Sequence, residues 1–219
     1  MHLTDLKDTY SGRIFILGTG PSLCEVPDWA GITPTFGCNK LGYWNRAPLT
    51  DFYACNYNKV IRGEVPNPNP AIHKFLVGTE DHLAEKGDLE WSDWVWVTKG
   101  ADSELETGAM VGNTFGAMTL ICAQIAYVLG FREMYLLGCD QTTEGSIFDP
   151  KDDRLFDQPA GTVFKDPSPW WAYFRDYLES NGGHIYDCSG GTLTESSWGS
   201  PSVLPYAALD EVLCQSPMT

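Results

Sequence analysis

Two glycines, a proline and a serine follow a short apolar run near the start of the sequence, in the order Gly18-Thr19-Gly20-Pro21-Ser22. Glycine permits backbone angles and close approaches that a Cβ forbids, and proline fits the first turn of a helix, where its missing N–H costs nothing. A turn of this kind at a helix N-terminus presents N–H groups to an anion. The motif therefore predicts a site for the phosphate of a nucleotide or of a nucleotide-linked substrate.

The same motif lacks two features of better-defined phosphate-binding sequences. Leu23 stands where the dinucleotide-binding fingerprint has its third glycine, and no Gly-Lys-Ser/Thr sequence follows the turn. A Gly-x-Gly turn after a strand also occurs in α/β proteins that bind no ligand there. The turn alone leaves a binding role and a purely structural role open.

Amide side chains follow the next two apolar runs. Asn39 comes after the run 35–38, and Asn56 and Asn58 come after the run 51–55. The carboxyl ends of parallel strands meet at one edge of a sheet, where ligands of α/β proteins bind. An amide both donates and accepts hydrogen bonds, so these side chains could recognise a base or a sugar hydroxyl. Each asparagine is also a common turn former, and that structural role is the alternative.

One carboxylate and one helix start complete the candidate site. Asp140 follows a buried apolar run and could act as a catalytic base or bind a ribose or a metal, with a helix cap or turn as the alternative. Gly112, Asn113 and Thr114 begin a predicted helix that would face the same edge, with Asn113 or Thr114 as its cap. No spacing among the acidic residues defines a metal site, so metal ligands stay unknown and Mg²⁺ stays an open cofactor.

The elements that must position these residues are those of an α/β domain. Apolar spacing and capping residues predict helices over 113–129, 168–181 and 207–213. Short apolar runs predict strands over 14–17, 35–38, 51–55, 73–77, 91–98, 133–140 and 184–188. Because helix and strand alternate in the second half, the sheet is expected to be mostly parallel. The whole chain, 1–219, is expected to form one nucleotide-binding domain, with a lid or insertion over 141–168.

Composition disfavours several kinds of partner and compartment. The 219 residues carry a formal net charge of −15 with scattered basic residues, which disfavours nucleic acid and anionic membranes. Seven cysteines without a C-x-x-C pair predict reduced thiols in a cytoplasmic compartment. The polar N-terminus does not resemble a signal peptide, and no run approaches the roughly 20 apolar residues of a membrane span. A homo-oligomer is left open.

Several of these motifs together resemble a known family. The turn Gly18-Thr19-Gly20-Pro21-Ser22-Leu23 resembles the G-N-G-P-S-L opening of the bacterial sialyltransferases of family GT42. The segment Phe36–Asn39 resembles the F-R-x-N strand end of that family, and Tyr53–Asn58 resembles the strand that follows. The block from Gly112 to Asp140 resembles its helix and G-x-x-x-[IM]-x-L-x-G-x-D strand. The pattern is also similar to the wider DUF115 group, which includes glycosyltransferases and hydroxymethylpterin pyrophosphokinases.

The resemblance implies a single Rossmann-like domain of the GT-A type, with a mostly parallel sheet and helices on both faces. By match to the family, CMP would be held by Gly18, Gly20, Ser22, Asn39, Asn58 and the Asn113-Thr114 turn. The sequence departs from the family in three places. Thr19 replaces an asparagine, and the segment 164–168, where the family places a base histidine, contains none. The lid tyrosines that contact phosphate in the family are not evident here.

Three functions follow as hypotheses. The first is a glycosyltransferase that uses a nucleotide-activated sugar, a CMP-sugar or another NDP-sugar, with Asp140 or an acidic lid residue as the base. The second is a Mg²⁺-dependent pyrophosphokinase that transfers diphosphate from ATP to a pterin-like alcohol, with Asp140 and loop acids on the metal. The third is an inactive nucleotide-binding protein with the same fold.

Overall fold

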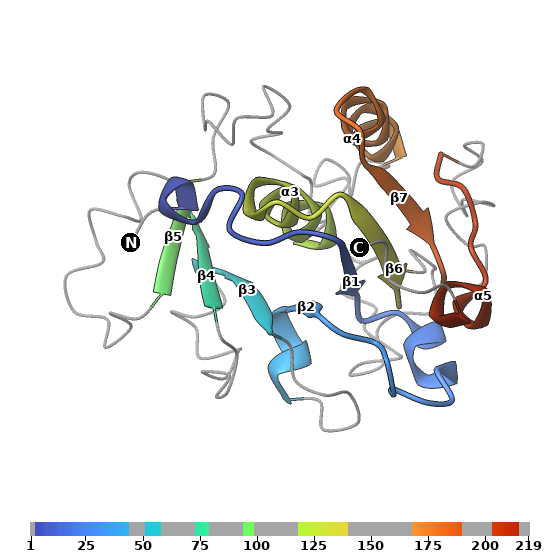
Figure 1. Ribbon diagram of the computed structural model, residues 1–219. Coiled ribbons are helices and arrows are strands. Elements are labelled where there is room, and N and C mark those ends of the chain that lie inside the picture. The colour runs from blue at the N-terminus through green and yellow to red at the C-terminus, as the bar shows by residue number, and fades with distance from the viewer. Residues whose placement is uncertain are drawn as a thin grey trace, which may run out of the picture.

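Seven parallel strands form one sheet in the computed structural model, which describes residues 3–43, 51–57, 73–78, 94–98, 118–139, 168–189 and 203–214. The strand order is β5-β4-β3-β2-β1-β6-β7, and every pairing is parallel (Figure 1). The bounds are β1 Arg13–Leu17, β2 Thr35–Cys38, β3 Phe52–Asn56, β4 His73–Gly78, β5 Trp94–Thr98, β6 Glu133–Leu137 and β7 His184–Asp187. Nearly continuous apolar runs suit such strands because a parallel sheet is buried on both faces.

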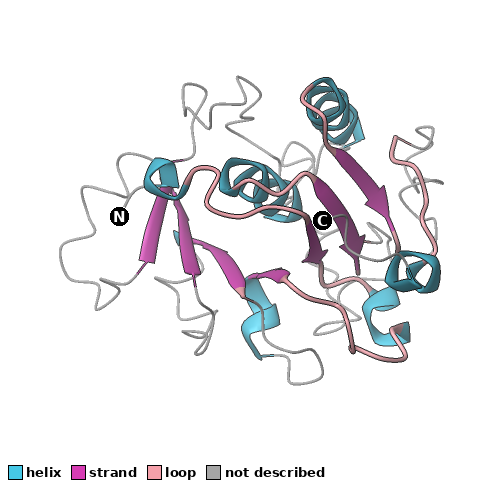
Figure 2. Ribbon diagram, viewed as in Figure 1, coloured by secondary structure: helices cyan, strands magenta, loops and turns pink. Residues whose placement is uncertain are grey.

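Helices cover both faces of this sheet (Figure 2). One core cluster joins η1 (Leu3–Leu6), α3 (Met118–Leu129) and α4 (Ser168–Ser180) to one face. A second cluster joins η2 (Pro21–Glu25), η3 (Asn39–Tyr43) and α5 (Leu209–Cys214) to the other. The predicted fold class, an α/β domain with a mostly parallel sheet and helices on both faces, is confirmed.

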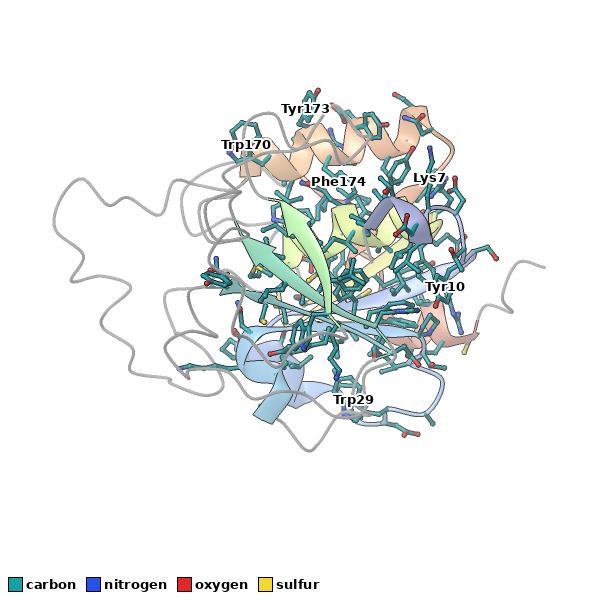
Figure 3. All side chains as sticks on the ribbon, turned by 90° about the vertical axis from the view of Figure 1, so that its left-hand side faces the viewer. Lys7, Tyr10, Trp29, Trp170, Tyr173 and Phe174 are labelled. Carbon is teal, nitrogen blue, oxygen red and sulfur yellow. The ribbon has the colours of Figure 1, made fainter. Side chains whose placement is uncertain are left out.

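The inward faces of the helices explain their position. In α4, Phe174 is completely buried and points toward the core, whereas Tyr173 points outward and is half exposed (Figure 3). In α3, the ring of Tyr127 packs edge-on against Tyr177 of α4, with centroids 5.5 Å apart. Gly130 ends α3 with φ +112, as the sequence predicts for a glycine just beyond a helix.

Most predicted boundaries lie within two residues of those in the structure, and three predicted segments near the candidate site differ more or lie beyond the described residues. The predicted strand over 133–140 ends at Leu137, because Gly138 takes the left-handed conformation with φ +66. The helix expected from residue 113 is described from Met118, and residues 113–117 lie outside the described residues. The lid expected over 141–168 lies outside them except for Ser168, which begins α4. No helix in the described ranges has the length and apolar character needed to cross a membrane.

A tyrosine and a histidine pair at the amino edge of the sheet, opposite the predicted site. Tyr10 Oη and His73 Nε2 lie 2.6 Å apart and share a hydrogen bond, while the His73 ring stacks on Phe52. Burial lowers the pKa of the His73 imidazole below its usual value. Burial, and then the nearby Asp51 carboxylate, raises the pKa of the Tyr10 hydroxyl. The folded protein therefore favours the neutral histidine.

From this pair we expect the stability of the protein to decrease at acidic pH. The unfolded chain, with a histidine pKa of about 6.5, takes up a proton that folded His73 resists, so the free energy of unfolding is expected to fall as the pH drops below that value. His73→Phe keeps a ring on Phe52 and is expected to flatten this dependence, measured by urea unfolding at several pH values. His184→Phe, which replaces an exposed histidine of β7, is the control. An equal flattening in both variants would contradict the assignment.

Candidate functional site

The direction in which successive strands are added to the sheet reverses once, beside β1. The chain builds the sheet outward from β1 to β5 and then returns to add β6 on the other side of β1 (Figure 1). In open α/β sheets, ligands bind outside the carboxyl ends of the strands at such a switch point, because the loops that follow the two strands diverge there. The turn Gly18–Ser22 directly follows β1 and therefore lies at this point.

The first glycine of the turn is required by packing against β6. The N–H of Gly18 donates to the Leu137 carbonyl at 2.7 Å, and the N–H of Gly20 donates to the Gly138 carbonyl at 2.7 Å. A Cβ on Gly18 would lie 2.2 Å from the Gly138 oxygen. These two N–H groups are therefore used within the fold. A phosphate at this turn must take its hydrogen bonds from other groups.

Thr19 lies between those two bonded glycines. Within the described part of the chain, Thr19 takes part in no hydrogen bond. Pro21 begins η2 and Ser22 is half-buried within it, while Gly20 before it has an extended backbone with φ −71 and ψ 160. The helix that the sequence predicts after the turn is thus a five-residue 3-10 helix. Such a short helix contributes less dipole than a full α-helix.

Asn39 occupies the next strand end. It follows β2 directly, begins η3 and has the left-handed φ of +48. Since Gly37 pairs with Leu17 in the sheet, Asn39 lies at the level of the glycine turn, one strand away. The Asn39 Oδ1 atom is shielded from solvent and accepts no hydrogen bond from the described residues. A buried acceptor normally has a donor partner, and a ligand could supply one.

The remaining predicted residues are divided between the described and undescribed parts. Asn56 ends β3, is half-buried and lies two strands from β1, which at the usual strand spacing is roughly 10 Å. The structure therefore brings Asn39, but not Asn56, next to the glycine turn. The other predicted site residues lie outside the described residues, namely Asn58, Gly112, Asn113, Thr114 and Asp140.

Sequence reasoning missed a buried carboxylate at the end of β7. Asp187 is completely buried, and its Oδ1 accepts a hydrogen bond from the Ser189 N–H at 2.8 Å. The Ser189 hydroxyl in turn accepts a hydrogen bond from the Cys139 N–H at 2.9 Å. These bonds fasten the chain segment directly before Asp140 to β7. The spacing of Asp187 and Ser189 is that of an Asx turn, which was the available signal in the sequence.

Three buried thiols gather behind the glycine turn. Cys38 ends β2, Cys139 follows β6 and Cys122 lies on α3. Burial, and then a hydrogen bond to the Cys38 thiol, raises the pKa of Cys122 well above its usual value. Within the described ranges no three His, Cys, Asp or Glu side chains are arranged to hold a metal ion. Because all three thiols are buried, they pack as small apolar groups beneath the site.

Comparison with known proteins identifies a similar fold but assigns the chain to no family. No family model matches the chain. A curated protein, the highly reducing polyketide synthase ctvA of Aspergillus terreus, is 28% identical over 148 residues. That match covers 61% of this chain, which spans only 6% of the length of the synthase.

Solved sialyltransferase structures match nearly the whole chain. CST-II in complex with a trisaccharide acceptor and CMP is 15% identical, with a TM-score of 0.56 over 89% of this chain and 86% of that one. CstII from Campylobacter jejuni in complex with CMP-3FNeuAc is 12% identical, with a TM-score of 0.55 over 90% and 89%. A CST-II variant in complex with CMP is 15% identical, with a TM-score of 0.57 over 87% of each chain. The chain therefore has an α/β fold similar to that of the CstII sialyltransferases.

Proposed function

We propose that this protein is a glycosyltransferase that transfers a sugar from a nucleotide-activated donor. A CMP-sugar is the first donor to test. The observation that supports this most is the pairing of the glycine turn with the left-handed Asn39 at the switch point of the sheet. The similar solved structures hold CMP or CMP-3FNeuAc in the same kind of fold. Ligands of such folds bind at this edge of the sheet.

Each site residue has a proposed role. The N–H of Thr19 faces no competing acceptor among the described residues and would donate to the donor phosphate, within the turn shaped by Gly18, Gly20, Pro21 and Ser22. The Asn39 amide would bind the ribose or the base, since its oxygen accepts no hydrogen bond from the part of the chain that the structure describes. Because the chain has a net charge of −15, an anion is expected to bind through backbone N–H groups rather than through a basic patch.

Asn56 and the residues beyond the described ranges complete the proposal. Asn56, at the end of the third strand, and Asn58 would contact the base or sugar. Gly112, Asn113 and Thr114 would add N–H and hydroxyl groups near the phosphate. Asp140 would remove the proton of the acceptor hydroxyl. The acceptor oxygen then bonds to the anomeric carbon, and the nucleotide leaves with the electrons of the broken glycosidic bond.

Titration calorimetry with CMP, UDP and ATP tests the proposal. We expect CMP to bind more tightly than UDP or ATP, and the protein to hydrolyse or transfer a CMP-sugar slowly. Failure to bind any of the three would rule the proposal out. Release of AMP from ATP that requires Mg²⁺ would instead indicate the pyrophosphokinase. Binding of CMP without turnover of any donor would indicate an inactive nucleotide-binding protein.

A further inference from the structure

Tyr53 reaches from the third strand to the backbone of Asn39. The side chain is completely buried, and its hydroxyl donates a hydrogen bond to the Asn39 carbonyl. Its strand neighbours Phe52 and Ala54 pack in the cluster with α3, so Tyr53 faces the opposite side of the sheet. The bond thus joins β3 to the turn that follows β2.

The ring of Tyr53 is itself held in place. It packs edge-on against Trp94 of β5, with ring centroids 5.9 Å apart and planes at 76°. The Lys74 ammonium on β4 lies 6.0 Å from the centroid of the same Trp94 ring. A ring fixed in this way has few alternative rotamers, so its hydroxyl is held at a defined point.

Asn39 needs such a restraint. A residue other than glycine is strained at φ +48, although asparagine tolerates the left-handed region better than most. Strained backbone persists where surrounding contacts over-determine it, and such residues cluster at ligand sites. The carbonyl that Tyr53 binds belongs to the strained residue itself, so the hydrogen bond acts directly on its backbone.

We infer that Tyr53 is a positioning residue for nucleotide binding: its hydroxyl holds Asn39 in the left-handed conformation that keeps the Asn39 amide beside the glycine turn. This inference rests on the proposed function for its ligand. Tyr53 does not touch the nucleotide and acts only through Asn39.

The test compares Tyr53→Phe with the wild-type protein. The variant removes one hydroxyl and keeps the ring packed on Trp94. We expect the CMP dissociation constant to rise about tenfold, the effect of about 1.4 kcal/mol, which is within the usual range for one buried hydrogen bond. In NMR spectra, the scalar coupling between the amide and α protons of Asn39, which reports φ, is expected to change.

Tyr135→Phe is the matched control. Tyr135 is a buried tyrosine on the same face of the sheet, stacked on Tyr186 with centroids 5.4 Å apart. We expect this variant to keep the wild-type CMP affinity and the wild-type Asn39 coupling, even where it lowers stability. Equal losses of affinity in the two variants would mean that Tyr53 has only a general structural role, and would overturn the inference.

A double-mutant cycle tests whether Tyr53 acts through Asn39. Glycine adopts the left-handed conformation without help, so adding Tyr53→Phe to Asn39→Gly is expected to cause no further loss of CMP affinity. Additive losses would overturn the inference. An unchanged CMP affinity in Tyr53→Phe would overturn it while leaving the proposed function intact. A wild-type protein that binds no nucleotide would overturn both.

Discussion

Gly18→Ala is expected to lower the free energy of unfolding by about 3 kcal/mol, at the upper end of the usual cost of overpacking. The added Cβ would lie 2.2 Å from the Gly138 oxygen and 3.0 Å from the Cys139 sulfur. The first contact is with backbone, which cannot swing aside as a side chain can. Relief would require β1 and the end of β6 to separate, which would break the 2.7 Å bond from the Gly18 N–H to Leu137.

The same separation is expected to weaken CMP binding, because it opens the switch point at which the turn lies. Urea unfolding and CMP titration of the purified variant measure the two effects. Gly182→Ala is the control: a Cβ there meets no atom within 4 Å, although φ is +76. Its cost is expected to be only the left-handed strain, about 1 to 2 kcal/mol. If Gly18→Ala proves no more destabilising than Gly182→Ala, the turn can move without separating β1 from β6.

Local sequence patterns were sufficient to predict the strands. The apolar runs before Gly18, Asn39 and Asn56 are all present as strands, since residues buried on both faces leave a continuous apolar signature. The helical spacing that leads to Gly130 also corresponds to a real helix. These strands and this helix depend on residues close together in the sequence, so a local pattern of residue types is enough to predict them.

Contacts between distant residues could not be predicted in this way. The motif at Gly18 predicts N–H groups that bind phosphate, but the Gly18 N–H donates to Leu137, which is remote in sequence. Tyr53 fits an apolar strand pattern, and nothing near it in the sequence indicates that its hydroxyl reaches Asn39. Asp187 is completely buried, and its N–H donates at 2.9 Å to the carbonyl of Pro205, which is remote in sequence. Such pairings are set by the order of strands in the sheet.

Asp140→Asn is expected to slow sugar transfer by about 10²–10⁴-fold, the usual contribution of a general base. Asparagine has nearly the same shape as aspartate but cannot take a proton from the acceptor hydroxyl. Asp140 follows Cys139, whose N–H is bonded to Ser189 at the end of β7. The Cys139 sulfur also lies close to Gly18, since a Cβ built there would meet it at 3.0 Å, so the chain before Asp140 lies beside the turn where the proposed donor binds. CMP affinity is expected to stay within about twofold of wild type, because the base acts on the acceptor and not on the nucleotide.

Initial rates with a CMP-sugar at saturating donor, together with CMP titration, separate these effects. The control is Asp210→Asn, which removes an exposed carboxylate from α5 and is expected to keep the wild-type rate. A wild-type rate in Asp140→Asn would place the base elsewhere in the chain. A parallel fall in rate and CMP affinity would mean that Asp140 binds the nucleotide. A fall in rate without a change in CMP affinity is the result expected for a side chain that removes the acceptor proton and does not hold the nucleotide.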